Sequence, residues 1–183
     1  MTMHSFNAVP RESKTVQVFQ GLGSNMGDRR HNLEWALHSL SQKMGIGQVS
    51  SVYDTAPVGN TAQARFLNLV CEADIYLTPT ELLAFIKEIE MDMGRQPGPP
   101  NSPRPIDIDI LFYDNQIINT PELIIPHPKL TERAFVLIPL AEIAPDFVHP
   151  VSGKTVSQVL KNLKVGADEV VRWENKRGET CTK

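Results

Sequence analysis

The pattern of apolar and polar positions along the chain predicts four helices. The second has the clearest start, because Thr78 is a cap, Pro79 takes the first helical position and Glu81 completes a capping box. The third is predicted to begin with Thr131 as its cap and to be kinked or shortened by Pro139. The four predicted helices span about 29–43, 79–93, 131–143 and 155–163.

Apolar runs between these helices predict extended strands. The first strand is expected to stop at a tight turn over 21–25, and a short hairpin is expected around 149–154. Mixed elements with hairpin connections favour an α+β fold, a single-domain sandwich with a largely antiparallel sheet and helices on its faces. The predicted strands cover 16–20, 48–53, 66–75, 106–113 and, as a partner of the last one, 116–119.

Length and composition fit one globular domain. With 183 residues, of which 41% are hydrophobic and 21% charged, the chain can build one core. We expect a loose N-terminal segment at 1–14, the domain at 15–165 and a polar C-terminal tail at 166–183. No stretch has the length of a signal peptide or membrane span, which favours a cytoplasmic protein without a membrane partner.

The charge balance and the cysteines narrow the class further. A formal net charge of -3 argues against a nucleic-acid partner, although a local basic pocket for small anions is compatible with it. Cys71 and Cys181 form neither a disulfide framework nor a metal-ligand spacing. Cys71 lies in an apolar run and is expected in the core, and free thiols indicate a reducing compartment.

Two aspartates in an apolar strand carry the most chemical information. Asp107 and Asp109 are two residues apart, so on a strand they share one face, while the neighbouring isoleucines take the other. Carboxylates placed this way can converge on two metal ions, and oxygen ligands without nearby histidine or cysteine favour magnesium. The alternative is a solvent-facing strand of alternating aspartate and isoleucine, but aspartate is a poor strand former.

Basic residues lie on separate segments around this strand. Arg95, Arg104 and Arg133 can each match phosphate oxygens in pairs, although each taken singly could also be a solvated surface charge. His127 stands in a stiff Pro-His-Pro frame, where it could bind a phosphate oxygen, relay a proton or simply face solvent.

A glycine-rich segment at 21–27 follows a strand and precedes a helix, as nucleotide-binding loops do. Its spacing does not match G-x-G-x-x-G, and no Gly-Lys-Ser/Thr follows. We interpret it as a tight turn able to line a pocket.

Taken together, these motifs resemble the 6-hydroxymethyl-7,8-dihydropterin pyrophosphokinases of folate synthesis. The similarity covers about 16–160, in order and without large gaps. Its most specific part is the Pro-Arg-x-x-Asp-x-Asp core. The segments that carry it are Gly23-Ser24-Asn25, Ser51 to Pro57, Phe66-Leu67-Asn68, Ile89-Glu90, Gly94-Arg95, Pro103 to Leu111, Pro126-His127-Pro128 and Glu132 to Leu137.

The resemblance implies a ferredoxin-like α+β fold and transfer of diphosphate from ATP, with AMP leaving. It implies that Asp107 and Asp109 bind two Mg2+ ions. It also implies that these two aspartates, Arg95 and Arg104 are the catalytic residues. The positions that match ATP-binding ones are Glu90, Arg95, Arg104, Ile110, His127 and Arg133. Those that match the pterin pocket are Thr55, Ala56, Val58, Phe66, Asn68 and Phe135.

The loop at 95–103 departs from the family pattern. Many relatives place a second basic residue and a Trp-Gly there, whereas this chain has a proline-rich segment. Two other readings therefore stay open: a different two-metal phosphoryl or nucleotidyl transferase, and a non-catalytic nucleotide- or pterin-binding homologue. In each reading the partners are small molecules, and a monomer is expected.

Overall fold

The computed structural model describes residues 15–57, 62–96, 98–99, 102–164 and 170–174. Its centre is a sheet in the order β5-β1-β4-β3-β8, with β2 also paired to β4, and these named pairings are antiparallel. The strands are β1 (Val16–Ser24), β2 (Gly45–Val49), β3 (Tyr53–Thr55), β4 (Phe66–Ile75), β5 (Asp107–Tyr113) and β8 (Val170–Arg172). A small separate hairpin joins β6 (Ile118–Asn119) to β7 (Ile124–Ile125).

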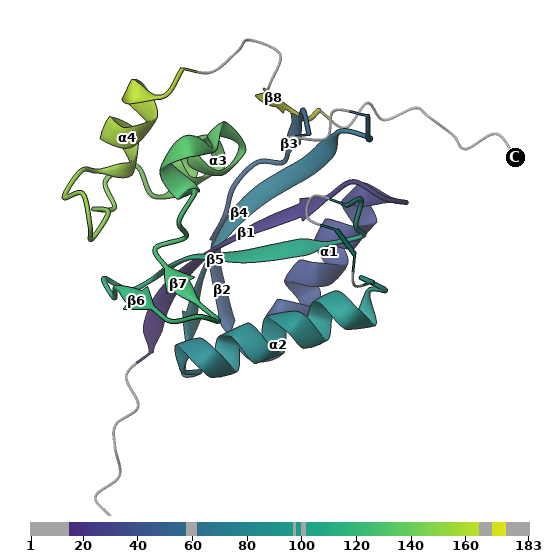
Figure 1. Cartoon of the computed structure of the whole chain (residues 1–183), viewed down its shortest axis with the longest axis horizontal. Coiled ribbons are helices and arrows are strands. Elements are labelled where there is room, and N and C mark those ends of the chain that lie inside the picture. The colour runs from purple at the N-terminus through teal and green to yellow at the C-terminus, as the bar shows by residue number, and fades with distance from the viewer. Residues whose placement is uncertain (1–14, 58–61, 97, 100–101, 165–169, 175–183) are drawn as a thin grey trace, which may run out of the picture.

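Helices cover both faces of this sheet, as predicted (Figure 1). On one face α1 (Arg29–Leu40) and α2 (Pro79–Asp92) enclose the larger core with the apolar side of β4. On the other face α3 (Ala134–Ile143) and α4 (Val156–Asn162) pack on a smaller core. From β1 to β5 the strands and helices follow one another as in ferredoxin-like folds, and β5 lies beside β1 in the sheet. This is the split βαβ arrangement.

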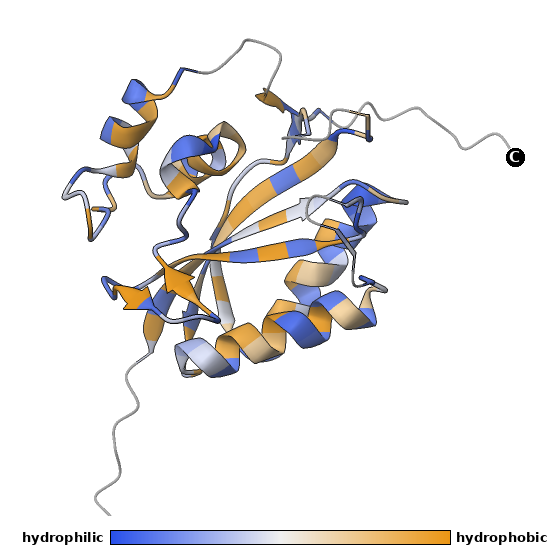
Figure 2. Cartoon of the chain, viewed as in Figure 1, coloured by the Kyte–Doolittle hydropathy of each residue, from blue (hydrophilic) through white to orange (hydrophobic). Residues whose placement is uncertain are grey.

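The side-chain pattern of the strands decides which face each residue takes. Five alternate residues of β4 lie in the larger core: Leu67, Leu69, Cys71, Ala73 and Ile75. Along β5 the alternation is visible as successive blue and orange bands in Figure 2. Because the two short C-terminal helices give the second face a smaller core, polar side chains can occupy the rest of that face.

Local signals placed α2 correctly. The Thr78 hydroxyl accepts from the Glu81 amide and the Glu81 carboxylate accepts from the Thr78 amide, so the predicted capping box is present with Pro79 behind it. Gly94 follows the helix with φ +85, a conformation that glycine adopts without strain. The Thr155 capping box starts α4 in the same way.

Two predicted strand boundaries and one predicted strand pairing are wrong. The strand predicted at 16–20 continues to Ser24, so most of the expected turn over 21–25 is strand, and residues 21–23 are paired with both β4 and β5. The strand predicted at 48–53 is two strands, β2 and β3. The segment at 116–119 pairs with β7 rather than returning along β5. For β1, β2 and β3 the deciding partner strands are remote in sequence, whereas the segment at 116–119 pairs with the nearby β7.

The C-terminal half also differs from expectation. Thr131 lies in the 3-10 turn η1 (Leu130–Glu132), and α3 begins after Arg133 without a side-chain cap. The helix runs through Pro139 to Ile143. Within the predicted polar tail, Val170–Arg172 forms β8 against β3, so this stretch is not loosely tied. The hairpin around 149–154 is present, closed by the pairing of Val148 with Thr155.

The prediction that Cys71 is a free cysteine in the core is confirmed. Cys71 is a free, buried core residue, and burial raises the pKa of its thiol to about 12. Cys181 lies outside the described residues. Across the described part of the chain, each helix is too short or too polar to cross a membrane.

Candidate active site

Strand β5 presents two carboxylates on the face that α3 and α4 leave partly open. Ile108 and Ile110 are buried in the larger core with α1 and α2. Asp107 and Asp109 therefore point to the opposite face, where they line a cavity. Their side chains are 29% and 33% exposed, so both are partly withdrawn from water.

Glycines of β1 stand opposite both aspartates. Gly23 pairs with Asp107, and Gly21 pairs with Asp109. Directly opposite residues of antiparallel strands share a face, so these glycines leave the floor of the cavity open between β5 and β4. Gly23 also pairs with Asn68 of β4, and a Cβ at Gly23 would lie 2.5 Å from the Asn68 Oδ1 atom.

The row across the sheet thus carries two kinds of chemistry. Asp107 and Asn68 are two strand spacings apart, about 10 Å. The Asn68 side-chain amide donates to Thr55 Oγ1 over 2.7 Å, and both residues are buried. The rings of Phe66 and Phe135 line the cavity at this end. It is therefore an amide-and-aromatic pocket next to a carboxylate site.

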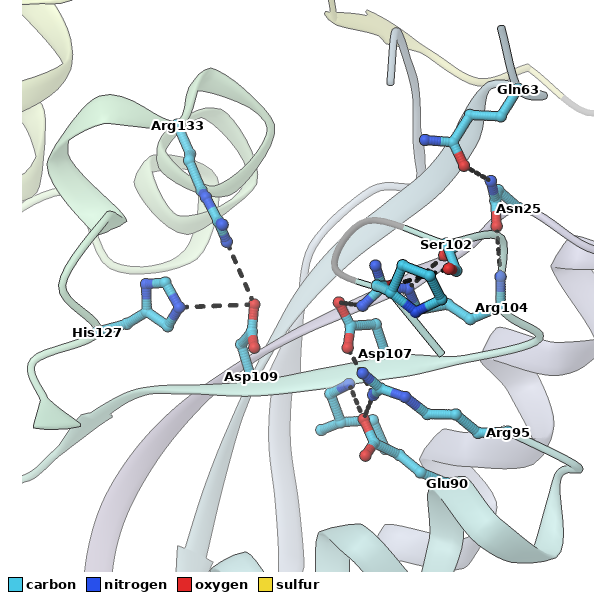
Figure 3. A network of polar contacts seen from close by, with 12 residues as sticks. Asn25, Gln63, Glu90, Arg95, Ser102, Arg104, Asp107, Asp109, His127 and Arg133 are labelled. Carbon is cyan, nitrogen blue, oxygen red and sulfur yellow. Dashed lines mark hydrogen bonds and ion pairs between the residues drawn. The ribbon is translucent and has the colours of Figure 1, made fainter. Parts of the chain in front are cut away.

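Two arginines hold Asp107. Arg104 Nη1 donates to Asp107 Oδ2 over 3.0 Å, and Arg95 Nη1 donates to Asp107 Oδ1 over 2.6 Å (Figure 3). Arg95 comes from the loop after α2, whereas Arg104 comes from the segment before β5. Both guanidinium groups therefore reach one carboxylate from separate loops and line the cavity.

Glu90 lies behind this pair. Its carboxylate, 2% exposed, accepts from Arg95, from Lys87 Nζ over 2.8 Å and from the backbone amide of Ile108 over 3.0 Å. Glu90 does not line the cavity. The structure thus places it as a buried anchor that joins α2, β5 and Arg95.

Asp109 has a different set of neighbours. Arg133 Nη1 lies 3.5 Å and His127 Nε2 lies 3.9 Å from Asp109 Oδ2, as Figure 3 shows. Desolvation, followed by repulsion from Asp107, raises the pKa of Asp109 to about 6. The charge of Asp107 therefore opposes the ionisation of Asp109 even with Arg133 nearby, and a positive ligand would relieve that repulsion.

His127 is fixed by the backbone around it. Its amide donates to Leu111 O over 3.1 Å, and the preceding Ile125–Pro126 bond is cis. The Lys129 amide donates to His127 Nδ1 over 3.2 Å, so Nε2 carries the proton of the neutral ring and faces Asp109. Desolvation, then the charge of Arg133, lowers the pKa of His127 to about 4, so the ring is neutral at pH 7.

One cavity of about 860 Å³ joins these groups. Its lining carries six lysines and arginines against three aspartates and glutamates, an excess of positive charge in a chain of net charge -3. Lys87, Lys129 and Lys164 add to this charge from outside the proline-rich loop. The predicted site residues that line the cavity are Thr55, Ala56, Phe66, Asn68, Arg95, Arg104, Asp107, Asp109, His127, Arg133 and Phe135.

The remaining predicted residues lie elsewhere. Ile110 is buried and lines a second, smaller cavity of about 260 Å³ between α2 and the β6–β7 hairpin. Asp109 and His127 line both cavities, so the two meet at the second aspartate. Val58 lies outside the described residues, as do positions 97, 100 and 101 of the proline-rich loop.

Asn25 is a site residue that sequence reasoning did not identify. Its Oδ1 atom accepts from the Arg104 amide over 2.8 Å, and its side-chain amide donates to Gln63 Oε1 over 3.0 Å. Asn25 thereby ties the end of β1 to Arg104 and to the segment that precedes β4 (Figure 3). The sequence signal was its place in the Gly23-Ser24-Asn25 motif, which local patterns alone do not connect with Arg104, 79 positions away.

Comparison with protein families gives one match over most of the chain. The family model described as 7,8-dihydro-6-hydroxymethylpterin-pyrophosphokinase (HPPK) matches residues 19–145. A pyrophosphokinase from Aquifex aeolicus, named 2-amino-4-hydroxy-6-hydroxymethyldihydropteridine pyrophosphokinase, is 41% identical over 77% of this chain and 88% of its own length. The protein of the same name from Bacillus subtilis is 41% identical over 86% of this chain and 98% of its own.

Other similar proteins are much longer. The folic acid synthesis protein FOL1 of Dictyostelium discoideum is 42% identical over 82% of this chain, which spans only 23% of that protein. The crystal structure of wild-type Plasmodium falciparum HPPK-DHPS with pterin and p-hydroxybenzoate superposes with a TM-score of 0.66. The superposition covers 84% of this chain and 42% of that chain, with 20% sequence identity. This likeness supports the assignment of the fold.

Proposed function

The chain belongs to the 7,8-dihydro-6-hydroxymethylpterin-pyrophosphokinase family, and we propose that it transfers a diphosphate group from ATP to 6-hydroxymethyl-7,8-dihydropterin. The hydroxymethyl oxygen is the acceptor, and AMP is the second product. The observation that carries this proposal is a single cavity with a cationic, carboxylate-bearing end and an amide-and-aromatic end. The relatives named above are pyrophosphokinases and folate-synthesis proteins, in agreement with this reaction.

The pterin is proposed to bind at the end near β3 and β4. Asn68 offers both an amide donor and a carbonyl acceptor, which match the mixed donor and acceptor edge of a pterin. Phe135 and Phe66 present aromatic surfaces to a flat bicyclic ring. Thr55 holds the Asn68 amide in orientation, and Ala56 is small enough to leave room for the ring.

The triphosphate is proposed to bind at the other end, beside β5. Arg95, Arg104 and Arg133 each project into the cavity and can donate in pairs to phosphate oxygens. His127 adds a neutral Nε2–H donor, whose direction is fixed by the Lys129 amide. Glu90 contributes through Arg95, and Ile110 lines the second cavity, where we propose that the nucleoside of ATP binds.

The residues present also fit magnesium. Among the described residues, no group of three or more histidine, cysteine, aspartate or glutamate side chains converges as a complete metal site. Two carboxylates remain, Asp107 and Asp109, and Mg2+ is commonly held by one or two carboxylates together with substrate phosphates. Their mutual repulsion, visible in the raised pKa of Asp109, is the kind that a cation offsets. When bound, two Mg2+ ions would neutralise phosphate charge.

The chain's own residues then act mainly by position and charge. The pterin end would direct the hydroxymethyl group toward the triphosphate end, where Asp107 lies about two strand spacings from Asn68. The hydroxymethyl oxygen attacks the β-phosphorus in line, the bond from that phosphorus to the oxygen shared with the α-phosphate breaks, AMP leaves, and the hydroxyl proton is released to solvent. Arg104 and Arg95 hold the charged groups on one side and Arg133 and His127 hold them on the other, so charge that spreads during transfer meets fixed donors.

A product assay tests this function. The protein is mixed with ATP, Mg2+ and 6-hydroxymethyl-7,8-dihydropterin, and the nucleotides are separated by chromatography. We expect AMP to form only when the pterin is present. Release of ADP or of inorganic diphosphate would indicate a different phosphoryl or nucleotidyl transferase, and no nucleotide product would indicate a binding protein without turnover. Either result contradicts the proposal.

A further inference from the structure

Three hydrogen bonds join α3 to the segment that leads into β3, and all three end on one carboxylate. Glu142 Oε2 accepts from the Ser51 amide over 2.9 Å and from the Tyr53 hydroxyl over 3.0 Å. Glu142 Oε1 accepts from the Ser51 hydroxyl over 2.7 Å. We call these hydrogen bonds between Glu142 and Ser51 and Tyr53 the clamp. They join residues 91 and 89 positions apart in sequence, so the clamp is a tertiary contact rather than part of a local turn.

The clamp lies on the same side of α3 as a cavity residue. Glu142 follows Phe135 by seven positions, so the two side chains are about 20° apart around the helix. Phe135 lines the amide-and-aromatic end of the cavity, and Glu142 grips the segment before β3 near the other end of the helix. The position of one helix face is therefore set at both ends, once against the cavity and once against residues 51–53.

The gripped segment leads directly into the opposite wall of the cavity. Tyr53 is the first residue of β3 and pairs with Asn68 of β4. Two residues later, Thr55 receives the Asn68 amide hydrogen bond and lines the cavity. Tyr53 and Thr55 are two residues apart on β3, so their side chains share one face of the sheet, the face that α3 covers. A shift at Tyr53 thus moves the residues that orient Asn68.

The electrostatics agree with a formed clamp. Burial alone would raise the pKa of Glu142, but the hydrogen bonds from Ser51 and Tyr53 outweigh that effect and hold its pKa below the usual value. The carboxylate is ionised at neutral pH, and charged acceptors make stronger hydrogen bonds than neutral ones.

We propose that Glu142 is a positioning residue that sets the spacing between Phe135 on α3 and the Thr55–Asn68 pair, and so determines affinity for the pterin. This inference rests on the proposed function, since it concerns the acceptor end of the same cavity. Among the described residues, the side-chain hydrogen bonds of Glu142 go to Ser51 and Tyr53 and not to the β5 residues that face the triphosphate end. Its effect is therefore specific to one substrate.

Steady-state kinetics of Glu142→Gln test the proposal. The variant keeps the side-chain shape but loses the charge and one acceptor oxygen. We expect the KM for 6-hydroxymethyl-7,8-dihydropterin to rise about fivefold, while kcat and the KM for ATP change less than about twofold. Asp146→Asn is the matched control, an exposed acid just beyond the same helix, and it should leave all three constants unchanged.

A double variant tests whether Glu142 acts through the segment it grips. If it does, Ser51→Ala in the Glu142→Gln background adds little to the rise in KM, because the two side chains serve one contact. Additive effects, or equal KM values for the wild type and a folded Glu142→Gln protein, overturn the proposal. If Glu142→Gln does not fold, Tyr53→Phe and Ser51→Ala decide: a rise confined to the pterin KM supports the proposal, and an unchanged KM overturns it. Absence of turnover in the wild type would instead contradict the proposed function.

Discussion

The two ends of the cavity are built in different ways. At the β5 end, polar side chains from separate segments meet at two carboxylates: Arg95 and Arg104 at Asp107, and Arg133 with the neutral ring of His127 at Asp109. At the β4 end, the groups are neutral, and their places are set by strand register, with Gly23 between Asp107 and Asn68. Binding at the β5 end should therefore depend on the charges of its side chains, and binding at the β4 end on the volume that the side chains there leave free. Substitutions of charge and of volume should therefore affect different substrates.

The largest expected effect comes from removing a carboxylate at the charged end. Asp107→Ala and Asp109→Ala should each lower kcat about 1000-fold, because each loses a proposed magnesium ligand and leaves nearby arginines without their partner. Circular dichroism should show the fold retained, since neither residue is in the cores. Turnover within tenfold of the wild type, about 1.4 kcal/mol in activation free energy, would contradict the metal assignment.

The next effect concerns volume at the neutral end. A Cβ at Gly23 would lie 2.5 Å from Asn68 Oδ1, closer than real contacts allow, so Gly23→Ala must displace the Asn68 side chain. We expect the KM for the pterin to rise about tenfold with a smaller change in the KM for ATP.

Gly21→Ala provides the matched control on the same strand. There the nearest atom to an added Cβ is Leu111 Cδ2 at 3.5 Å, an ordinary contact. If both variants have the same KM for the pterin, the spacing argument for the neutral end fails.

The smallest of these effects tests the connection between the two ends. Asn25→Ala removes the acceptor of the Arg104 amide and the donor to Gln63, so it should loosen the segment that carries Arg104. We expect kcat/KM to fall about fivefold for both substrates, because Asn25 supports the loops at both ends. Asn162→Ala, which removes a hydrogen bond to the Gln158 carbonyl at the end of α4, is the control. A change in one KM alone would show that the ends are independent at this residue.

The difference between the ends also explains which parts of the site could be predicted from sequence. Asp107 and Asp109 were identified because period two on a strand is a local property, and the Thr78 capping box was identified for the same reason. The sequence pattern predicts a turn at Gly21 and Gly23, because glycine favours turns unless partner strands lie on both sides. Only the register with β4 and β5 shows that these glycines provide space.

Contacts between remote segments were beyond local patterns altogether. Val170–Arg172 is too short to be recognised as a strand without β3 beside it. Glu142 reads as an ordinary exposed helix residue until the fold brings Ser51 against it, 91 positions away. In these cases tertiary pairing, not propensity, determined the structure.

The most direct test of the account is a crystal structure with both substrates in place. The complex would contain Mg2+, 6-hydroxymethylpterin and an ATP analogue whose α–β bridging oxygen is replaced by a methylene group. We predict that the pterin edge contacts Asn68 with its ring against Phe135, while the β-phosphate lies beside Asp107, Asp109 and Arg104. A pterin outside the β3–β4 end, or a triphosphate away from the two aspartates, would contradict the central claim that one cavity holds donor and acceptor for direct transfer.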